Sequence, residues 1–114
     1  MKKLIFLIVV ISVFASIMLL LSINPVEPGS AQGTINDKLQ HFGAFLILSF
    51  FLMLLFSHKA IDFKYPYLLA IVLAIAYGIL IEIIQYGIPY RSFSFLDMLA
   101  DTIGSLAIIL YKLF

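Results

Sequence analysis

The sequence predicts an all-α membrane protein, built as a bundle of four transmembrane helices that are joined by short loops. Apolar residues make up 64% of the chain and charged residues only 11%, against about 25% charged residues in soluble domains. The apolar residues form long runs without the two-residue alternation of membrane β-strands. Short polar, proline or glycine segments separate the runs, so we expect a single membrane domain over residues 1–114 with neighbouring helices antiparallel.

Other classes of protein fit this composition poorly. The chain has no cysteine, which excludes a disulfide-rich secreted scaffold. Its formal net charge is only +1, so the charge gives no support for binding to nucleic acid. We therefore expect membrane lipids as partners and no nucleic acid, while the oligomeric state stays open.

The first predicted helix covers residues 4–23. These 20 residues carry no charge and would form a helix about 30 Å long, enough to cross the hydrocarbon core of a bilayer. Residues 24–29, which include two prolines, end the helix. A cleaved signal peptide is the alternative because Lys2 and Lys3 give a basic start. The apolar region of a signal peptide is usually only about 7–15 residues long, so we favour a retained span.

The other three predicted helices cover residues 37–56, 66–86 and 94–113. Thr34 and Ser94 are candidate N-caps, because each is followed three residues later by an aspartate. Pro66 suits the first turn of a helix, and Gly87 suits a helix end. These signals bound three further apolar segments.

The distribution of basic residues predicts that both termini lie in the cytoplasm. Cytoplasmic loops carry an excess of lysine and arginine. In a four-span topology the side that holds the N-terminus carries five basic residues, and the opposite side carries only Lys38 and Arg91. The five are Lys2, Lys3, Lys59, Lys64 and Lys112.

Unusual polar residues occur where the second and fourth helices begin and the third ends, which is the same membrane surface in this topology. His41 lies about 6 Å beyond Asp37 along its helix, Asp101 about 6 Å beyond Asp97, and Glu82 about 7 Å before the third helix ends. On each helix the polar residues share one face. A carboxylate near mid-helix that faces lipid costs about 2.5–3.5 kcal/mol. We therefore expect these polar faces to meet each other or a wet cavity.

This predicted cluster is short of positive charge. It holds four carboxylates and two basic side chains, which leaves two negative charges in excess when His41 is neutral; the charged residues are Asp37, Glu82, Asp97, Asp101, Lys38 and Arg91. A protonated carboxyl, a cation or a ligand would complete such a site.

Three segments of the chain resemble the VanZ-like family of small bacterial membrane proteins. They are Asn36–Phe42 (NDKLQHF), Gly78–Gln85 (GILIEIIQ) and Arg91–Gly104 (RSFSFLDMLADTIG), and the resemblance covers about residues 36–110. It implies that the family's signature positions are Asp37, Lys38, His41, Glu82, Gln85, Arg91 and Asp97. The family usually has asparagine where this chain has Asp101.

The resemblance implies a multi-pass protein of the bacterial inner (cytoplasmic) membrane. The namesake of the family is associated with resistance to the glycopeptide teicoplanin. We expect a binding protein for the headgroup of an envelope lipid or for a glycopeptide-type ligand, rather than an enzyme. The expected ligand-binding residues are Asp37, Lys38, His41, Glu82, Gln85, Arg91, Asp97 and Asp101.

Three alternatives stay open at this stage. The first is a membrane hydrolase or transferase that acts on an envelope lipid, with His41, Glu82 and Asp97 as catalytic candidates and with His41 oriented by Glu82 or Asp97. The second is a divalent metal site, but the chain lacks paired histidines or cysteines at ligand spacing, so we expect neither a metal nor another cofactor. The third is ion or proton transfer, although the polar residues extend only about a third of the way across the membrane.

Overall fold

The computed structural model describes residues 2–23, 35–87 and 95–113. All regular structure in these ranges is α-helical, which confirms the predicted all-α class. The helices are α1 (Lys2–Ile23), α2 (Ile35–Ser57), α3 (Pro66–Tyr86), α4 (Phe95–Leu106) and α5 (Ile108–Leu113). The predicted N-caps Thr34 and Ser94 lie outside the described residues.

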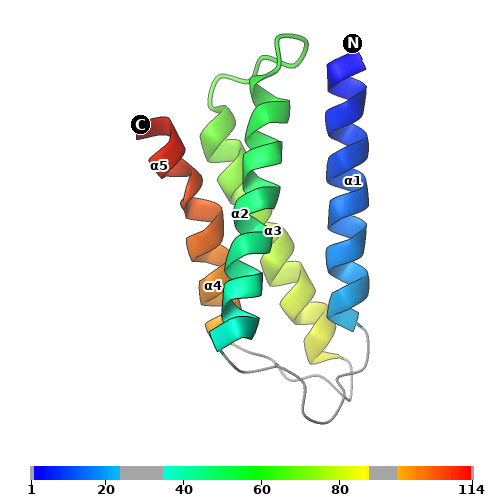
Figure 1. Cartoon of the computed structure of the whole chain (residues 1–114), viewed down its shortest axis with the longest axis vertical. Coiled ribbons are helices and arrows are strands. Elements are labelled where there is room, and N and C mark those ends of the chain that lie inside the picture. Colours follow the sequence, from blue (N-terminus) through cyan, green and yellow to red (C-terminus); the bar gives the residue numbers. More distant parts are fainter. Residues whose placement is uncertain (1, 24–34, 88–94, 114) are drawn as a thin grey trace.

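The helices run alternately up and down, with α2 packed against α1, α3 and α4 (Figure 1). The start of α1, the turn between α2 and α3 and the end of α5 lie at one end of the bundle. The start of α2, the end of α3 and the start of α4 lie at the other end, as the sequence predicts. We call the latter the polar end.

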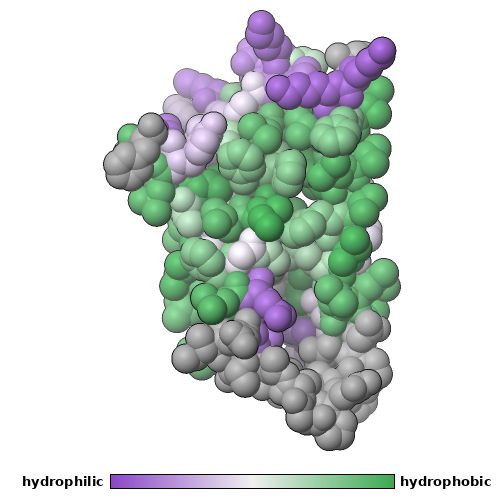
Figure 2. All heavy atoms as spheres, in the orientation of Figure 1, coloured by the Kyte–Doolittle hydropathy of each residue, from purple (hydrophilic) through white to green (hydrophobic). Residues whose placement is uncertain are grey.

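Within the described residues, three helices are long and apolar enough to cross a membrane, at Lys2–Ile23, Asp37–Ser57 and Pro66–Tyr86. Many of their large apolar side chains are exposed on the surface, for example Phe6 and Ile83. Figure 2 shows this surface as a broad hydrophobic belt between hydrophilic groups near the two ends. A surface of this kind is costly in water and suits contact with lipid.

The last helical segment differs from the single predicted helix over residues 94–113. It is divided at Ala107 into α4, with 12 residues, and α5, with 6 residues. The amide of Ala107 is shared between the carbonyls of Ile103 (3.0 Å) and Gly104 (3.2 Å), a pattern that tightens a helical turn. Glycine favours helix weakly, and the Ser105 hydroxyl donates to the Asp101 carbonyl at 2.8 Å, which bends helices. Neither α4 nor α5 alone has the length of a membrane span.

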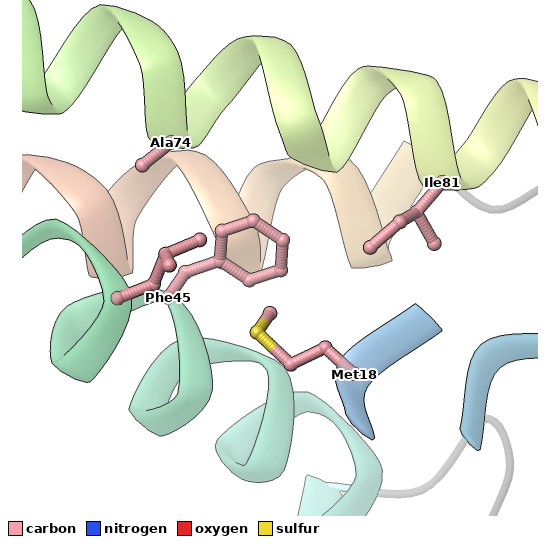
Figure 3. Packing of buried hydrophobic residues seen from close by; sticks show 5 residues of the cluster. Met18, Phe45, Ala74 and Ile81 are labelled. Carbon is pink, nitrogen blue, oxygen red and sulfur yellow. The ribbon is translucent and has the colours of Figure 1, made fainter. Parts of the chain in front are cut away.

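The apolar core joins α1 to the rest of the bundle. In Figure 3 the Met18 side chain from α1 points toward the ring of Phe45, which lies between α2 and α3. The Tyr77 hydroxyl on α3 also donates to the Ala15 carbonyl on α1. A second buried cluster joins α2 and α3 to α5, and it consists of Met53, Phe56, Ala70, Ile71 and Ile108.

Two local features fix a helix start and a close contact between helices. Pro66 occupies the first turn of α3, as predicted, where its missing amide proton costs nothing. On α4, a Cβ atom at Gly104 would collide with the backbone carbonyl of Phe42 on α2. The two helices therefore approach closely there, and this contact brings the polar residues one turn before Gly104 next to those before Phe42.

Candidate functional site

Five ionisable side chains from two helices meet at the polar end of the bundle. Asp37, Lys38 and His41 come from the first turns of α2, and Asp97 and Asp101 come from α4. We call these five residues the polar cluster. The structure thus brings together five of the eight ligand-binding residues that the sequence suggests.

His41 lies at the centre of the polar cluster. Its ring Nδ1 is 2.8 Å from Oδ1 of Asp101. The other ring nitrogen, Nε2, is 3.8 Å from Oδ1 of Asp37 and 3.7 Å from Oδ2 of Asp97. If Asp101 is ionised, Nδ1 carries the proton that it donates, and Nε2 presents its lone pair to the other two carboxylates.

Lys38 connects the two helices on the other side of the same carboxylates. Its ammonium group binds Oδ1 of Asp97 and lies 3.2 Å from Oδ2 of Asp37. Each aspartate therefore uses one oxygen toward Lys38 and turns the other toward His41. Lys38 holds Asp37 and Asp97 in place.

Two of the three carboxylates in the polar cluster are buried, and the other three side chains are partly exposed. Asp97 is 4% exposed and Asp101 is 2% exposed. Buried charges are costly unless they are paired, and Lys38 and His41 are partners of these carboxylates among the described residues. Counted over these five residues alone, the formal charge is −2 when His41 is neutral.

The second oxygen of Asp101 has a distinct environment. Oδ2 of Asp101 has no hydrogen-bond partner among the described residues. It lies against α3 at Gly78, where an added Cβ atom would be 3.1 Å from this oxygen. Because Gly78 has no side chain, α3 leaves room for the Asp101 carboxylate next to His41.

The remaining three predicted ligand-binding residues are Glu82, Gln85 and Arg91. Glu82 is completely buried on α3, about one turn beyond Gly78. Gln85 donates its side-chain amide to the Ser22 carbonyl at 2.9 Å, so it ties the end of α3 to the end of α1. Arg91 lies outside the described residues.

The partner of His41 differs from the expected one. Sequence reasoning assigns its orientation to Glu82 or Asp97, whereas the structure gives the hydrogen bond to Asp101. Both Asp97 and Asp101 lie on the predicted polar face of α4, so periodicity alone could not distinguish them. The distinguishing signal is Gly104, whose contact with α2 sets the depth at which the two helices meet.

The donor atoms of three residues are close enough to share an ion. Asp37, His41 and Asp97 each offer a ligand atom, and these atoms lie within 4.8 Å of one another. The sequence predicts no metal, because the chain lacks paired histidines or cysteines at the spacing of metal ligands. The structure brings these three ligands together from two separate helices.

An apolar pocket lies farther along the same helices. It has a volume of about 340 Å³ between α2 and the α4–α5 segment, and its lining consists of Leu46, Ile47, Phe50, Phe51, Ala107, Ile108 and Tyr111. From His41 to Leu46 the rise along α2 is about 7 Å. The pocket therefore begins within about two helical turns of the polar cluster.

A bundle of apolar helices with buried carboxylates, a lysine and a histidine at one end defines a helical membrane protein with a candidate polar binding site. The chain matches the family model described as VanZ/LLP1 over residues 3–114, and it therefore belongs to this family. The match includes α1 and so extends beyond the motifs at residues 36–110. No curated protein and no solved structure matches the chain.

Proposed function

We propose that this VanZ-family protein binds the headgroup of an envelope lipid in its polar cluster. It lies in the bacterial cytoplasmic membrane with four crossings, α4 and α5 together forming the fourth, and with both termini in the cytoplasm. The start of α1 and the end of α5 lie at the same end of the bundle (Figure 1), which supports an even number of crossings. The polar cluster then faces the outer leaflet.

The observation that carries this proposal is the buried carboxylate of Asp101, one oxygen of which has no hydrogen-bond partner in the described part of the chain. A buried acceptor without a hydrogen bond costs about 1–3 kcal/mol, and a ligand that donates a proton to it would recover this free energy. We therefore propose a headgroup that is rich in amide N–H, ammonium or hydroxyl groups.

The apolar pocket supports a ligand that also carries a hydrocarbon chain. The pocket is lined by aliphatic and aromatic side chains of the same two helical segments that carry the polar cluster. A headgroup at His41 and Asp101 would place its chain alongside α2 in the direction of Phe50. Ligand sites of this type combine an apolar wall with a few polar groups that fix the orientation.

Native mass spectrometry of the purified protein with bacterial lipid extract tests the proposal. We expect the wild-type protein to retain one lipid through detergent exchange, and we expect His41→Ala and Asp101→Leu to lose it. Asp62→Asn, in the exposed turn at the opposite end, is the matched control and should retain the lipid. Equal retention by all four proteins would contradict a headgroup site in the cluster.

The hydrogen bond between His41 and Asp101 also favours a second candidate, a hydrolase or transferase that acts on an envelope lipid. A carboxylate that holds one ring nitrogen leaves the other free to accept a proton as a general base. In this scheme His41 is the base, and Glu82 and Asp97 are the further catalytic candidates. Turnover of labelled envelope lipids that is lost in His41→Ala would favour the enzyme, and lipid retention without turnover would favour a binding protein.

A further inference from the structure

We propose that the end of the bundle opposite the polar end binds the headgroups of anionic phospholipids through its lysines. The start of α1, the turn between α2 and α3 and the end of α5 lie together at this end (Figure 1). These segments carry five exposed lysines, which we call the basic surface: Lys2, Lys3, Lys59, Lys64 and Lys112. None of them belongs to the polar cluster, so this proposal does not depend on lipid binding there.

The basic surface carries positive charge that the described part of the chain does not neutralise. Within residues 2–23, 35–87 and 95–113, none of the five ammonium groups forms an ion pair. Asp62 is the only acidic residue at this end in the same ranges. The five lysines and Asp62 together carry a formal charge of +4. Each lysine close to an anionic membrane surface strengthens the attraction to that surface.

The lysines lie at the edge of the hydrophobic belt. Figure 2 shows hydrophilic groups directly beyond the belt at this end. Phe63, next to Lys64 in the chain, is 48% exposed, and Leu113, next to Lys112, is 71% exposed. In a membrane the apolar side chains favour the hydrocarbon and the ammonium groups favour the headgroups. The lysines are therefore at the depth of the lipid phosphates.

Two tyrosines hold lysine ammonium groups at the start of α3. The Lys64 ammonium lies 5.4 Å from the centre of the Tyr65 ring. The Lys112 ammonium lies 5.1 Å from the centre of the Tyr67 ring, so this pair joins α5 to α3. Both distances suit a cation–π interaction. A ring covers only one side of an ammonium group, whose remaining N–H groups can donate to phosphate oxygens.

The turn between α2 and α3 has a hydrogen-bonded conformation, which fixes the backbone around its lysines. The amides of Ile61 and Asp62 donate to the His58 carbonyl at 3.0 and 2.8 Å. The amide of Phe63 donates to the Phe56 carbonyl at 3.2 Å, and the rings of these two residues are 5.3 Å apart. Less order has to be gained when a ligand binds to a surface that is already formed.

A phospholipid matches both the charged and the apolar parts of this surface. Its anionic phosphate suits the ammonium groups, and its acyl chains suit the exposed apolar side chains beside them. A soluble acidic peptide would match the charge alone. We therefore favour a lipid of the membrane in which the protein lies.

Spin-labelled lipids in reconstituted bilayers test the proposal on the wild-type protein. Lipids at an exposed surface exchange rapidly, so the measurement is made in phosphatidylcholine vesicles and not after detergent exchange. EPR gives the fractions of labelled phosphatidylglycerol and of labelled phosphatidylcholine, with the same acyl chains, that the protein immobilises. We expect a several-fold preference for phosphatidylglycerol in about 0.01 M salt and its loss in about 1 M salt, where screening acts within about 3 Å. Equal association of the two lipids at low salt would overturn the proposal.

Paired variants test which side chains create the preference. Lys64→Gln combined with Lys112→Gln should lower it about twofold or more, whereas Lys64→Arg combined with Lys112→Arg keeps both charges and should preserve it. Tyr67→Leu should also lower the preference, because Lys112 loses its ring, and Tyr67→Phe should not. An equal preference in the glutamine and arginine variants would contradict a role of these lysines.

A soluble polyglutamate peptide, added to the same vesicles, tests the alternative partner. Peptide binding that requires Lys64 and Lys112, combined with equal association of the two lipids, would assign the basic surface to a protein partner and overturn the proposal. A lipid preference that the peptide does not abolish would support it. The salt dependence of the wild-type protein keeps the test independent of how the variants fold.

Discussion

His41 on α2 and Asp101 on α4 are joined by a contact of 2.8 Å between imidazole Nδ1 and carboxylate Oδ1. The contact lies among apolar helices, near the polar end of the bundle, and Asp101 is almost completely buried. It therefore fixes both the relative position of the two helices and the direction of the free ring nitrogen. The first prediction concerns this pair.

Asp101→Asn should leave the stability within about 1 kcal/mol of wild type, because an amide can still hydrogen-bond the imidazole and removes one buried negative charge. Asp101→Leu should lower the free energy of unfolding by about 1–3 kcal/mol, because Nδ1 of His41 loses its partner. Thermal unfolding in detergent measures both. Equal stability of the Asn and Leu variants would show that the hydrogen bond does not hold the helices together.

The second prediction concerns the close approach of α4 to α2. Gly104→Ala should destabilise the protein by about 1–3 kcal/mol, since the added Cβ meets the carbonyl of Phe42. Gly43→Ala, on α2, is the matched control because nothing lies within 4 Å of its added Cβ. It should stabilise the protein by about 0.5–1 kcal/mol through helix propensity. Urea unfolding of both variants checks the opposite signs.

The third prediction concerns the space that α3 leaves for Asp101. An added Cβ at Gly78 would lie 3.1 Å from Oδ2 of Asp101 and 3.2 Å from Cε1 of Phe45. Gly78→Ala should therefore shift the Asp101 carboxylate and weaken lipid retention several-fold without removing a polar group. Native mass spectrometry at graded detergent exchange measures the loss. Unchanged retention would mean that the position of Asp101 is not critical for the ligand.

The fourth prediction concerns topology, which cysteine labelling can test directly because the natural chain has no cysteine. Single cysteines at Lys3, Asp62 and Lys112 should react with a membrane-impermeant maleimide only after the cells are permeabilised. Gly87→Cys, at the polar end of α3, should react in intact cells. If one of the cysteines at Lys3 and Lys112 reacts in intact cells and the other only after permeabilisation, the two positions lie on opposite sides of the membrane. This result would contradict a fourth crossing.

The fifth prediction concerns glycopeptide susceptibility. Expression of the wild-type protein in a sensitive bacterium should make that bacterium less susceptible to teicoplanin-type glycopeptides. His41→Ala and Arg91→Ala should each abolish this protection. Membrane levels of each variant, followed by immunoblot, are the control. Protection that survives both substitutions would separate the polar cluster from resistance.

Much of the fold follows from local signals. The third helix is predicted over residues 66–86 and α3 covers Pro66–Tyr86, because a proline and a glycine bound a continuous apolar run. The division at Ala107 had no comparable signal. It depends on how Gly104 packs against Phe42 and on the hydroxyl of Ser105, which are tertiary and local contacts that periodicity does not report.

For the candidate site, the sequence predicts the depth of each polar residue in the membrane and the helix face on which it lies. Helical spacing predicts that Asp37, His41, Asp97 and Asp101 meet, because antiparallel helices place them near one membrane surface. The individual pairs could not be predicted, since they depend on the rotation of α4 against α2. The amide of Gln85 could not be assigned either, because its acceptor, the Ser22 carbonyl, belongs to a helix whose packing the sequence left open.

Photo-crosslinking with an envelope lipid that carries its reactive group in the headgroup tests the central claim most directly. The account predicts adducts on residues 37–41 and 97–101, and it predicts that Asp101→Leu removes them while Asp62→Asn does not. Adducts confined to the exposed apolar faces of α1 and α3, unchanged in Asp101→Leu, would contradict a headgroup site in the polar cluster.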